Sequence, residues 1–551
     1  MKTKKRFAAI LLAAVMAAST ACSQGGGTTS NGFDTKTYNT YVASDPESID
    51  AQKGSEIYGN AVVNNVYEPL IRLVQDENKN LKVEKAGAED YTVSEDATKY
   101  TFKIRQGMVW EDDTPVTAHD YEYGIKRTAD PNTGSGSAFL LADVKNFDDV
   151  NSGKKPLDEL GVKALDDYTL EITLAHPAQY FEKIVPFRVC FPQRQDIVEQ
   201  NGDSFGSEAD TIMACGPYTV ESWTHNSQIV LKKNPKYWDA DKVQLETVNM
   251  KVLADLNARM NAFQADEVMS INTNLPEWTE KFDQKENVEK VEQMMPSMDY
   301  LAVNHEDKLF SNKKVRQAFN TAIDREDFNA KAASGTSTPA YYWVPGAISI
   351  GDLNYREKAE EPIKDLQNSV KDPKALLSEG LKELGMDEDP SKLEVSLICV
   401  NEPLVKKYGE YLQENLQKVL GVKINLEVME WAVLSGRIAN GDYQLGYLAW
   451  TADYNDPSAM LSLFRSSATS IQTGWKSEEY DKLLDQATKE KDSEKAADLY
   501  KQAETMLAEE SVIIPLLTGK TYLYYQNVVK NINENVFSTA GFKYTYIEEN
   551  K

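Results

Sequence analysis

A cysteine at position 22 separates two segments of opposite character and sets where the folded chain begins. Residues 2–6 carry four basic side chains, residues 7–18 are apolar and residues 19–21 are small. The apolar run is shorter than the roughly 20 residues of a membrane-spanning helix, so residues 1–21 are predicted to be a secretory signal peptide. Residues 22–33 are rich in Gly, Ser and Thr, which is typical of a flexible tether. We therefore expect the rest of the chain to fold after export.

Cys22, between a signal peptide and a tether, resembles the acylated cysteine of bacterial lipoproteins. The resemblance implies a lipid on Cys22 and a chain that is anchored to the cell membrane and faces the extracellular or periplasmic side. One departure is Ser19, where lipoproteins usually carry leucine. The alternative is ordinary secretion, with cleavage after Ala21 and a free thiol at Cys22.

Charge and length exclude some classes of protein. The chain carries 60 Lys and Arg against 86 Asp and Glu, a net charge of −26, and no basic patch stands out. We therefore expect no nucleic-acid partner. A chain of 551 residues is long enough for two or three domains.

The residues that usually carry catalysis or bind metal are sparse. His119, His176, His225 and His305 lie in unrelated contexts, and no cysteine has a Cys or His at metal-ligand spacing. A Gly-x-Ser-x-Gly elbow and a phosphate-binding Gly-rich loop are also missing from the sequence. We therefore expect no metal site, no cofactor and no enzymatic activity.

Hydrophobic periodicity predicts a mixed α/β fold. Alternating residues predict strands at 38–43, 100–105, 168–174, 422–428 and 443–450, and helical spacing predicts helices at 117–126, 313–328, 373–384 and 404–420, with two more in 477–507. The strand, helix and strand within residues 422–450 form a crossover unit of a parallel sheet. Ligands of such sheets bind beyond the carboxyl ends of strands, which directs attention to the loop Thr451–Pro457.

Several motifs together resemble one family. They are Tyr100–Ile104, Arg105–Trp110, Thr114–Asp120, Gly216–Tyr218, Asn234–Trp238, Val315–Ala318 and Ala452–Asn455. Their order and spacing are similar to those of the oligopeptide- and dipeptide-binding lipoproteins, family 5 of the bacterial extracellular solute-binding proteins, which feed ATP-driven (ABC) importers. The resemblance covers nearly the whole mature chain.

The resemblance implies a two-lobed α/β fold of the periplasmic-binding-protein type, in the large family-5 form of type II, with an extra inserted domain. Lobe I would combine residues 34–63, 192–296 and 519–551, the inserted domain II would span 64–191, and lobe II (domain III) would span 297–518. The lobes of such proteins close on a ligand by hinge motion.

The same resemblance implies a monomer that captures peptides between its lobes and delivers them to a membrane permease. Alternatives within the class are another cargo (a nickel complex, haem or a sugar) or a peptide-signal receptor. A surface hydrolase is a remote alternative, because it needs a nucleophile, a base and an orienting group that these residues do not supply.

Asp453 is the main candidate for ligand binding. In the family, the aspartate of the Ala-Asp-Tyr-Asn motif receives the α-ammonium group of the peptide, and a charge-assisted bond of this kind is worth about 1.5–3 kcal/mol. The structural alternative is a turn residue, because residues 453–457 have turn-forming composition.

The other candidates come from the same resemblance. Trp450 and Trp431 match tryptophans that line the cleft of relatives, with core packing as the alternative. Tyr447 stands where a relative has a cleft arginine, and Val405 where it has a histidine for the peptide carboxylate. The remaining candidates are Gly54, Ser55 and Glu56, in a segment that borders the peptide in relatives, and Arg437, which is one position out of register.

Three cysteines other than Cys22 leave room for one intramolecular disulfide. A relative's disulfide positions are occupied here by Ser297 and Thr451. Cys190 and Cys215 flank the region where the chain returns to lobe I, and export permits a bond between them. The alternative is that both are buried as small apolar residues.

Overall fold

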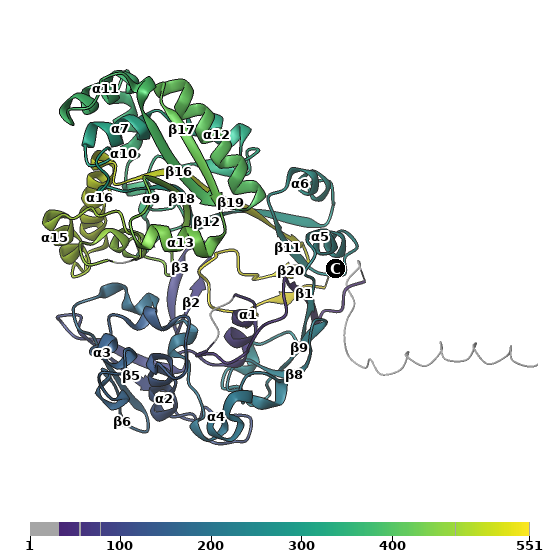
Figure 1. Ribbon diagram of the computed structural model, residues 1–551. Helices are drawn as coiled ribbons and strands as arrows, with labels where there is room; N and C mark the ends of the chain where they lie inside the picture. Colours follow the sequence, from purple (N-terminus) through teal and green to yellow (C-terminus); the bar gives the residue numbers. More distant parts are fainter. Residues whose placement is uncertain (1–31, 54–56, 78, 469, 550–551) are drawn as a thin grey trace, which may run out of the picture.

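The computed structural model describes residues 32–549 apart from residues 54–56, 78 and 469, and these form two lobes (Figure 1). The early chain forms the lower lobe in that view, and the green segments form the upper one. The predicted signal peptide, Cys22 and the predicted ligand residues Gly54, Ser55 and Glu56 lie outside the described residues.

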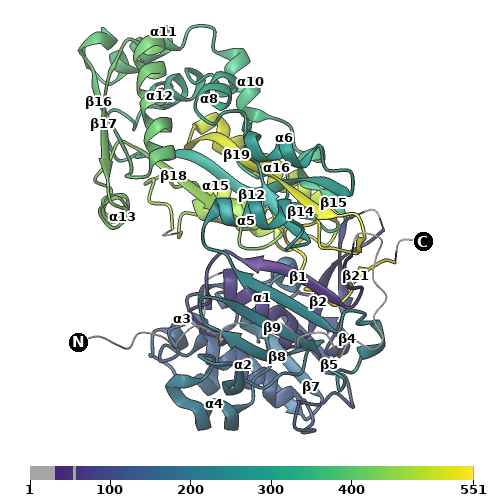
Figure 2. The same cartoon turned by 90° about the vertical axis from the view of Figure 1, so that its right-hand side faces the viewer.

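Lobe I is organised around a four-stranded sheet in the order β1-β10-β9-β8 (Figure 2). β1 (Thr37–Val42) runs parallel to β10 (Thr247–Val252), which pairs antiparallel with β9 (Gln228–Lys233), and β9 pairs antiparallel with β8 (Tyr218–Thr224). The expected first strand is thus confirmed, and its partner lies far away in the sequence.

The inserted region has its own antiparallel sheet in the order β4-β5-β7-β6. Its strands are β4 (Ala88–Val93), β5 (Lys99–Ile104), β6 (Val162–Asp166) and β7 (Thr169–Thr173), and helix α2 (Ala118–Ala129) lies against β6 and β7. Thr117 and Asp120 form a capping box at the start of α2, where the sequence predicted a helix from residue 117. The side chains of this sheet and of the lobe I sheet belong to one continuous hydrophobic core, so the two pack as one body.

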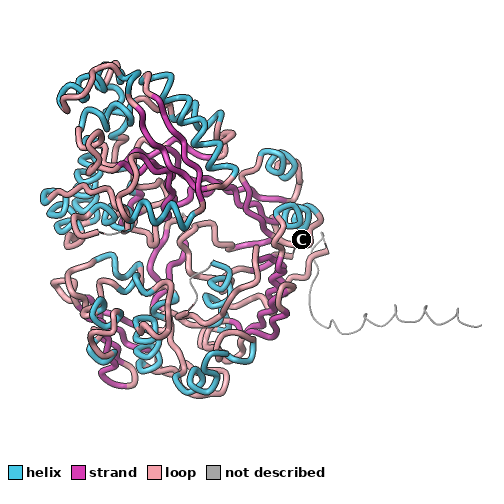
Figure 3. Tube along the Cα trace, in the orientation of Figure 1, coloured by secondary structure: helices cyan, strands magenta, loops and turns pink. Residues whose placement is uncertain are grey.

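Lobe II is built on the largest sheet, in the order β11-β19-β12-β18-β16-β17 (Figure 3). Its strands are β11 (Ser270–Thr273), β12 (Val288–Val303), β16 (Glu394–Val400), β17 (Lys423–Met429), β18 (Leu445–Thr451) and β19 (Ile513–Gln526), and β13 (Ser337–Pro339) pairs with β19. The crossover from β17 through α13 (Trp431–Ala439) to β18 is confirmed, with β16 parallel to both strands and lying between them. Three separate hydrophobic clusters contain buried side chains of this sheet.

Two long strands run through both lobes. β12 and β19 pair along most of their length, and their register breaks between Met294 and Met298 and again between Asp299 and Tyr300. The expected boundaries at 296/297 and 518/519 fall within these strands, so two continuous strands connect the lobes. A pair of strands with such irregular steps can bend there without losing the pairing on either side.

Most helices of lobe II lie where periodicity placed them. They are α11 (Pro373–Glu383), α12 (Pro403–Leu420), α15 (Glu478–Ala487) and α16 (Ser493–Glu510). The single helix expected at 313–328 is wrong: the segment forms α7 (Lys313–Thr321) and α8 (Arg325–Lys331). Asp324 accepts a hydrogen bond from the Asp327 amide and caps α8, so a new helix starts there.

The remaining elements are short or lie at the periphery. They are α1 (Ile57–Val66), α3 (Phe147–Asn151), α4 (Gln195–Asn201), α5 (Leu256–Gln264), α6 (Pro276–Phe282), α9 (Tyr355–Lys358), α10 (Pro362–Ser369), α14 (Ser458–Leu461), β2 (Ile71–Gln75), β3 (Leu81–Lys85), β14 (Ser349–Ile350), β15 (Leu353–Asn354), β20 (Val529–Lys530) and β21 (Tyr546–Ile547). Among the described residues, no helix combines the length and the apolar character needed to span a membrane.

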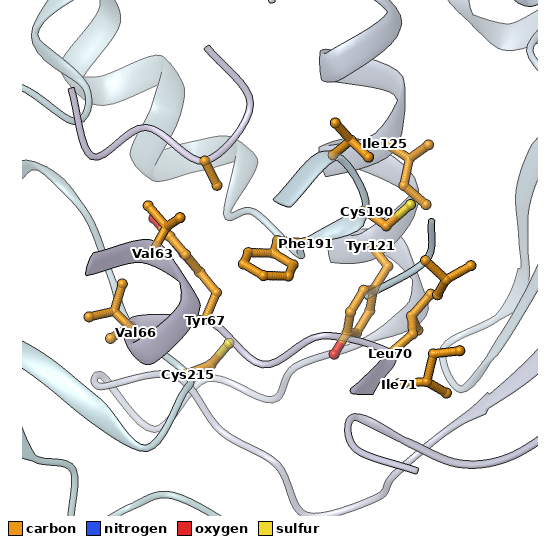
Figure 4. Close-up of a cluster of buried hydrophobic side chains, with 14 of the residues drawn as sticks. Val63, Val66, Tyr67, Leu70, Ile71, Tyr121, Ile125, Cys190, Phe191 and Cys215 are labelled. Atoms are coloured by element: carbon orange, nitrogen blue, oxygen red, sulfur yellow. The ribbon is translucent and has the colours of Figure 1, made fainter. Parts of the chain in front are cut away.

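The disulfide expected between Cys190 and Cys215 is not formed. Both are free and buried, as is Cys399. Figure 4 shows the sulfurs of Cys190 and Cys215 well separated within the same core, with the Phe191 ring between them. Burial raises the pKa of both thiols, which is the behaviour of small apolar core residues.

A buried ion pair fastens the inserted domain to lobe I. The Arg127 guanidinium on α2 donates two hydrogen bonds to the Asp50 carboxylate, at 2.7 and 2.6 Å. Asp50 is buried, and Arg188 donates to its backbone oxygen at 2.7 Å. The two regions therefore share charge neutralisation as well as a hydrophobic core.

Removal of this cation tests that connection. We expect Arg127→Met to lower the free energy of unfolding by about 3 kcal/mol, because the Asp50 carboxylate stays buried without its partner. Urea unfolding, followed by tryptophan fluorescence, measures the change. The matched control is Lys85→Met, which breaks a half-exposed pair with Asp90 and is expected to change the free energy of unfolding far less, because exposed ion pairs contribute little to stability. Equal effects of the two substitutions would contradict this role of Arg127.

Candidate functional site

One edge of β18 is open over most of its length. β12 pairs with β18 from Leu445 to Thr451, but β16 pairs with it only at Leu445 and Gly446. Within the described chain, no strand occupies the second edge of residues 447–451. An extended peptide can add to such an edge through main-chain hydrogen bonds.

The carboxylate of Asp453 lies just beyond this strand without a counter-charge. Asp453 is half-buried, and none of the hydrogen bonds and ion pairs found among the described residues involves its side chain. Burial raises the pKa of Asp453 to about 6. A carboxylate that has lost water and gained no partner favours the approach of a cation, and this is a common property of functional sites.

The turn that follows β18 is stabilised by hydrogen bonds of the side chains after Asp453. The Asn455 side chain accepts a hydrogen bond from the Ser349 amide at 2.8 Å. The Asp456 carboxylate accepts from the amide and the hydroxyl of Ser458 at 2.9 and 2.6 Å. The turn is therefore stabilised by other side chains, which weakens the alternative that Asp453 is there only for the turn.

This loop is also a contact between the lobes. The Tyr454 ring stacks on Tyr180 of the inserted domain, with ring centroids 5.2 Å apart and planes 10° from parallel. The Gln179 amide donates to the Thr488 carbonyl of lobe II at 3.2 Å. Asp453 thus lies next to a place where the two lobes meet. This stack could not be predicted from the sequence, because its two tyrosines come from distant segments.

The two predicted tryptophans differ in exposure. Trp431 begins α13 and is 60% exposed. Three other large apolar side chains near the carboxyl ends of β16 and β17 are also exposed: Leu404, Val428 and Val433. Trp450 is half-buried against the core of lobe II, and its indole Nε1 is buried without a hydrogen-bond partner in the described chain. Exposed apolar residues in such a group are typical of a binding surface, so Trp431 stays a ligand candidate. Trp450 contributes part of its side chain to the core of lobe II.

Of two other predicted ligand residues, Arg437 is already paired with carboxylates and Tyr447 is buried. The Arg437 guanidinium binds the Glu427 carboxylate at 2.6 Å and lies 3.3 Å from that of Asp442, so its charge is already neutralised. Tyr447 is buried, and its ring packs 5.8 Å from that of Tyr408. Val405 is partly buried against the same core. The structure therefore brings no free arginine to the positions where a relative holds the peptide carboxylate.

Sequence reasoning missed Asp299. It lies on β12 opposite Ala449 of β18, and burial raises the pKa of its carboxyl to about 6. A single carboxylate within the apolar stretch Met298–Val303 was the available signal, but so acidic a chain offers many carboxylates.

Two hollows in the structure lie away from Asp453. A hollow of about 230 Å³ is bordered by Leu81, Gln293, Ser349 and Glu534, and one of about 450 Å³ lies around His119 and Arg127. Asp453 borders neither of them. Across the described residues, no group of three His, Cys, Asp or Glu side chains is arranged to hold a metal ion.

Known relatives span the whole chain. The Bacillus subtilis oligopeptide-binding protein OppA is 31% identical, with 98% of this chain and all of that protein covered. The dipeptide-binding protein DppE of the same organism is 33% identical, with 92% of this chain and 89% of that protein covered.

Solved structures confirm the two-lobed architecture. The unliganded open form of the murein tripeptide-binding protein MppA matches with a TM-score of 0.77 at 24% identity, covering 95% of this chain and 99% of that one. Listeria monocytogenes OppA bound to peptide matches with a TM-score of 0.68 at 29% identity, covering 94% and 99%. The pattern of the "Bacterial extracellular solute-binding proteins, family 5 Middle" matches residues 82–472. The chain therefore belongs to the bacterial extracellular solute-binding proteins of family 5.

Proposed function

We propose that this chain captures extracellular peptides between its lobes and delivers them to the permease of an ABC importer, without chemically altering them. The observation that carries the proposal is the unpartnered carboxylate of Asp453 at the end of a strand whose second edge is open. The carboxylate suits the α-ammonium group of a peptide, and the strand edge suits its main chain. The names of the relatives, oligopeptide- and dipeptide-binding proteins, support this cargo.

Binding through the main chain explains how one site can accept many sequences. The open edge from Tyr447 to Thr451 offers amide and carbonyl groups that every peptide can pair with. Trp431 and its exposed apolar neighbours offer contact area for side chains. Closure of lobe I and the inserted domain over this edge, by bending of β12 and β19, would complete the site.

We further propose that the predicted domain division describes the moving parts. Lobe I and the inserted domain share one core and the Asp50–Arg127 pair, so they move together. Lobe II carries β18 and Asp453. The protein is expected to act as a monomer, anchored through a lipid on Cys22.

Substitution of Asp453 tests the pairing with the peptide amino terminus. We expect Asp453→Ala to weaken binding of tetra-alanine by about two orders of magnitude or more, because the ammonium group is then enclosed without its counter-charge. N-acetylation of the peptide should weaken binding to the original protein comparably and add little further loss in the variant. Isothermal titration calorimetry measures all four affinities.

The control for net charge is Glu478→Ala, which removes an exposed carboxylate of the same lobe and should change affinity less than threefold. If acetylated and free peptides bind the original protein equally well, Asp453 does not receive the amino terminus.

The raised pKa of Asp453 predicts how binding depends on pH. In the free protein the carboxyl is largely protonated below about pH 6, whereas the bound ammonium requires the ionised form. Binding below pH 6 must therefore release a proton, and affinity for tetra-alanine should fall about tenfold between pH 7.5 and 5. Calorimetry in buffers of different ionisation enthalpy measures the proton release. Asp453→Asn should remove most of this dependence; an equally steep fall in that variant would assign it to another group.

The anchor is tested by changing Cys22. If Cys22 carries lipid, Cys22→Ala should move the protein from the membrane fraction to the culture medium or periplasm, because the acyl chains supply the membrane affinity. Fractionation followed by mass spectrometry of the amino-terminal peptide measures both properties. An original protein that is already free in solution, with an unmodified Cys22, would contradict the anchor.

A further inference from the structure

A second carboxylate lies on the binding face of lobe II. Asp299 on β12 is directly opposite Ala449 on β18, and Leu301 is opposite Tyr447. Side chains alternate along a strand, so Asp299, Tyr447, Ala449 and Thr451 point to the same side of the sheet. Ala449 and Thr451 are exposed there, so this face is accessible next to the open edge of β18.

Asp299 has no positive partner. None of the ion pairs found among the described residues includes it. Burial raises the pKa of its carboxyl to about 6, and the Tyr447 hydroxyl opposes that effect. The charged or titratable groups that influence this cluster are Asp299, Tyr408, Tyr447 and Cys399, and none of them is a cation.

Tyr447 supplies an independent sign of an unfilled site. It is 3% exposed, and its hydroxyl has no hydrogen-bond partner by distance and angle in the described chain. The hydroxyl nevertheless lies close enough to the Asp299 carboxylate for each group to shift the pKa of the other. The Tyr447 hydroxyl has one proton to donate toward the half-buried Asp299 carboxylate, so the hydroxyl oxygen and the remaining carboxylate oxygen are left without donors. A ligand group with several N–H donors and a positive charge would satisfy both.

Resting on the proposed function, we propose that Asp299 and Tyr447 form a second ligand site, which takes the positively charged side chain of a lysine or arginine in the peptide. Asp453 lies four residues beyond Ala449 in the sequence. At about 3.3 Å per residue, the two carboxylates are separated by roughly 13 Å along the strand direction. A peptide whose amino terminus is at Asp453 would therefore bring its third, fourth or fifth residue to Asp299.

The surrounding charges favour a basic ligand over an acidic one. Asp299 on β12 and Asp453 just beyond β18 are two carboxylates without a cationic partner, and the arginine candidate, Arg437, is bound to Glu427. An acidic side chain at the second site would meet a like charge in a partly dehydrated place. A neutral side chain would leave the two polar groups as they are. Lysine and arginine alone among side chains bring both the charge and the donors at neutral pH.

A scan of lysine along a pentapeptide tests the site. Penta-alanine is given lysine at position 2, 3, 4 or 5, and each peptide has a counterpart with norleucine, which has a similar shape and no charge. Calorimetry at pH 7.5 measures the dissociation constants. We expect lysine to bind at least tenfold more tightly than norleucine at one position from 3 to 5. In Asp299→Asn, which keeps the shape and removes the charge, that ratio should fall below threefold. The matched control Glu478→Gln should keep the ratio of the original protein.

A ratio below threefold at every position in the original protein, or an unchanged ratio in Asp299→Asn, overturns the second site. Equal gains for lysine and for glutamate at the same position would do the same, because they exclude recognition of charge. These results differ from a failure of the proposed function, in which the norleucine peptides would not bind or would bind equally well after N-acetylation. The two hypotheses can therefore fail separately.

Discussion

A carboxylate that is partly removed from water without a partner is the constraint on which this account depends. Asp453 has a raised pKa because burial penalises its charge and nothing among the described residues compensates. The surrounding loop holds it in place through the hydrogen bonds of Asn455 and Asp456 and the stacking of Tyr454 on Tyr180. Keeping this charge without a partner therefore lowers the stability of the free protein, and the ammonium group of a ligand neutralises the charge when it binds.

The structure around this carboxylate has two parts: a single unit formed by lobe I and the inserted domain, and the two strands β12 and β19 that continue from this unit into lobe II. Lobe I and the inserted domain have a common core and a buried ion pair, so they behave as one unit. β12 and β19 continue from this unit into lobe II, and their pairing is irregular between Met294 and Met298. β12 also supports β18 along its length and carries Asp299. One of the two strands that connect the lobes therefore also positions the binding edge.

Local elements were predictable from the sequence, whereas long-range pairing was not. The apolar face and the glycine stop of α12, and the alternation in β18, depend on neighbours within a few residues. The pairing of β1 with β10, and the position of β16 between β17 and β18, depend on contacts between distant segments. Asp453 was found through its motif. Asp299 was not foreseen, and the sequence left open whether Cys190 and Cys215 are bonded to each other or buried as free thiols, because burial decides their chemistry and burial is a property of the whole fold.

A crystal structure of the protein with tetra-alanine tests the central claim most directly. The account predicts the peptide ammonium within hydrogen-bond distance, about 2.7–3.0 Å, of the Asp453 carboxylate. It also predicts main-chain hydrogen bonds between the peptide and the open edge of residues 447–451. A peptide bound elsewhere, or held with its amino terminus in solvent and the β18 edge still unpaired, would contradict the account.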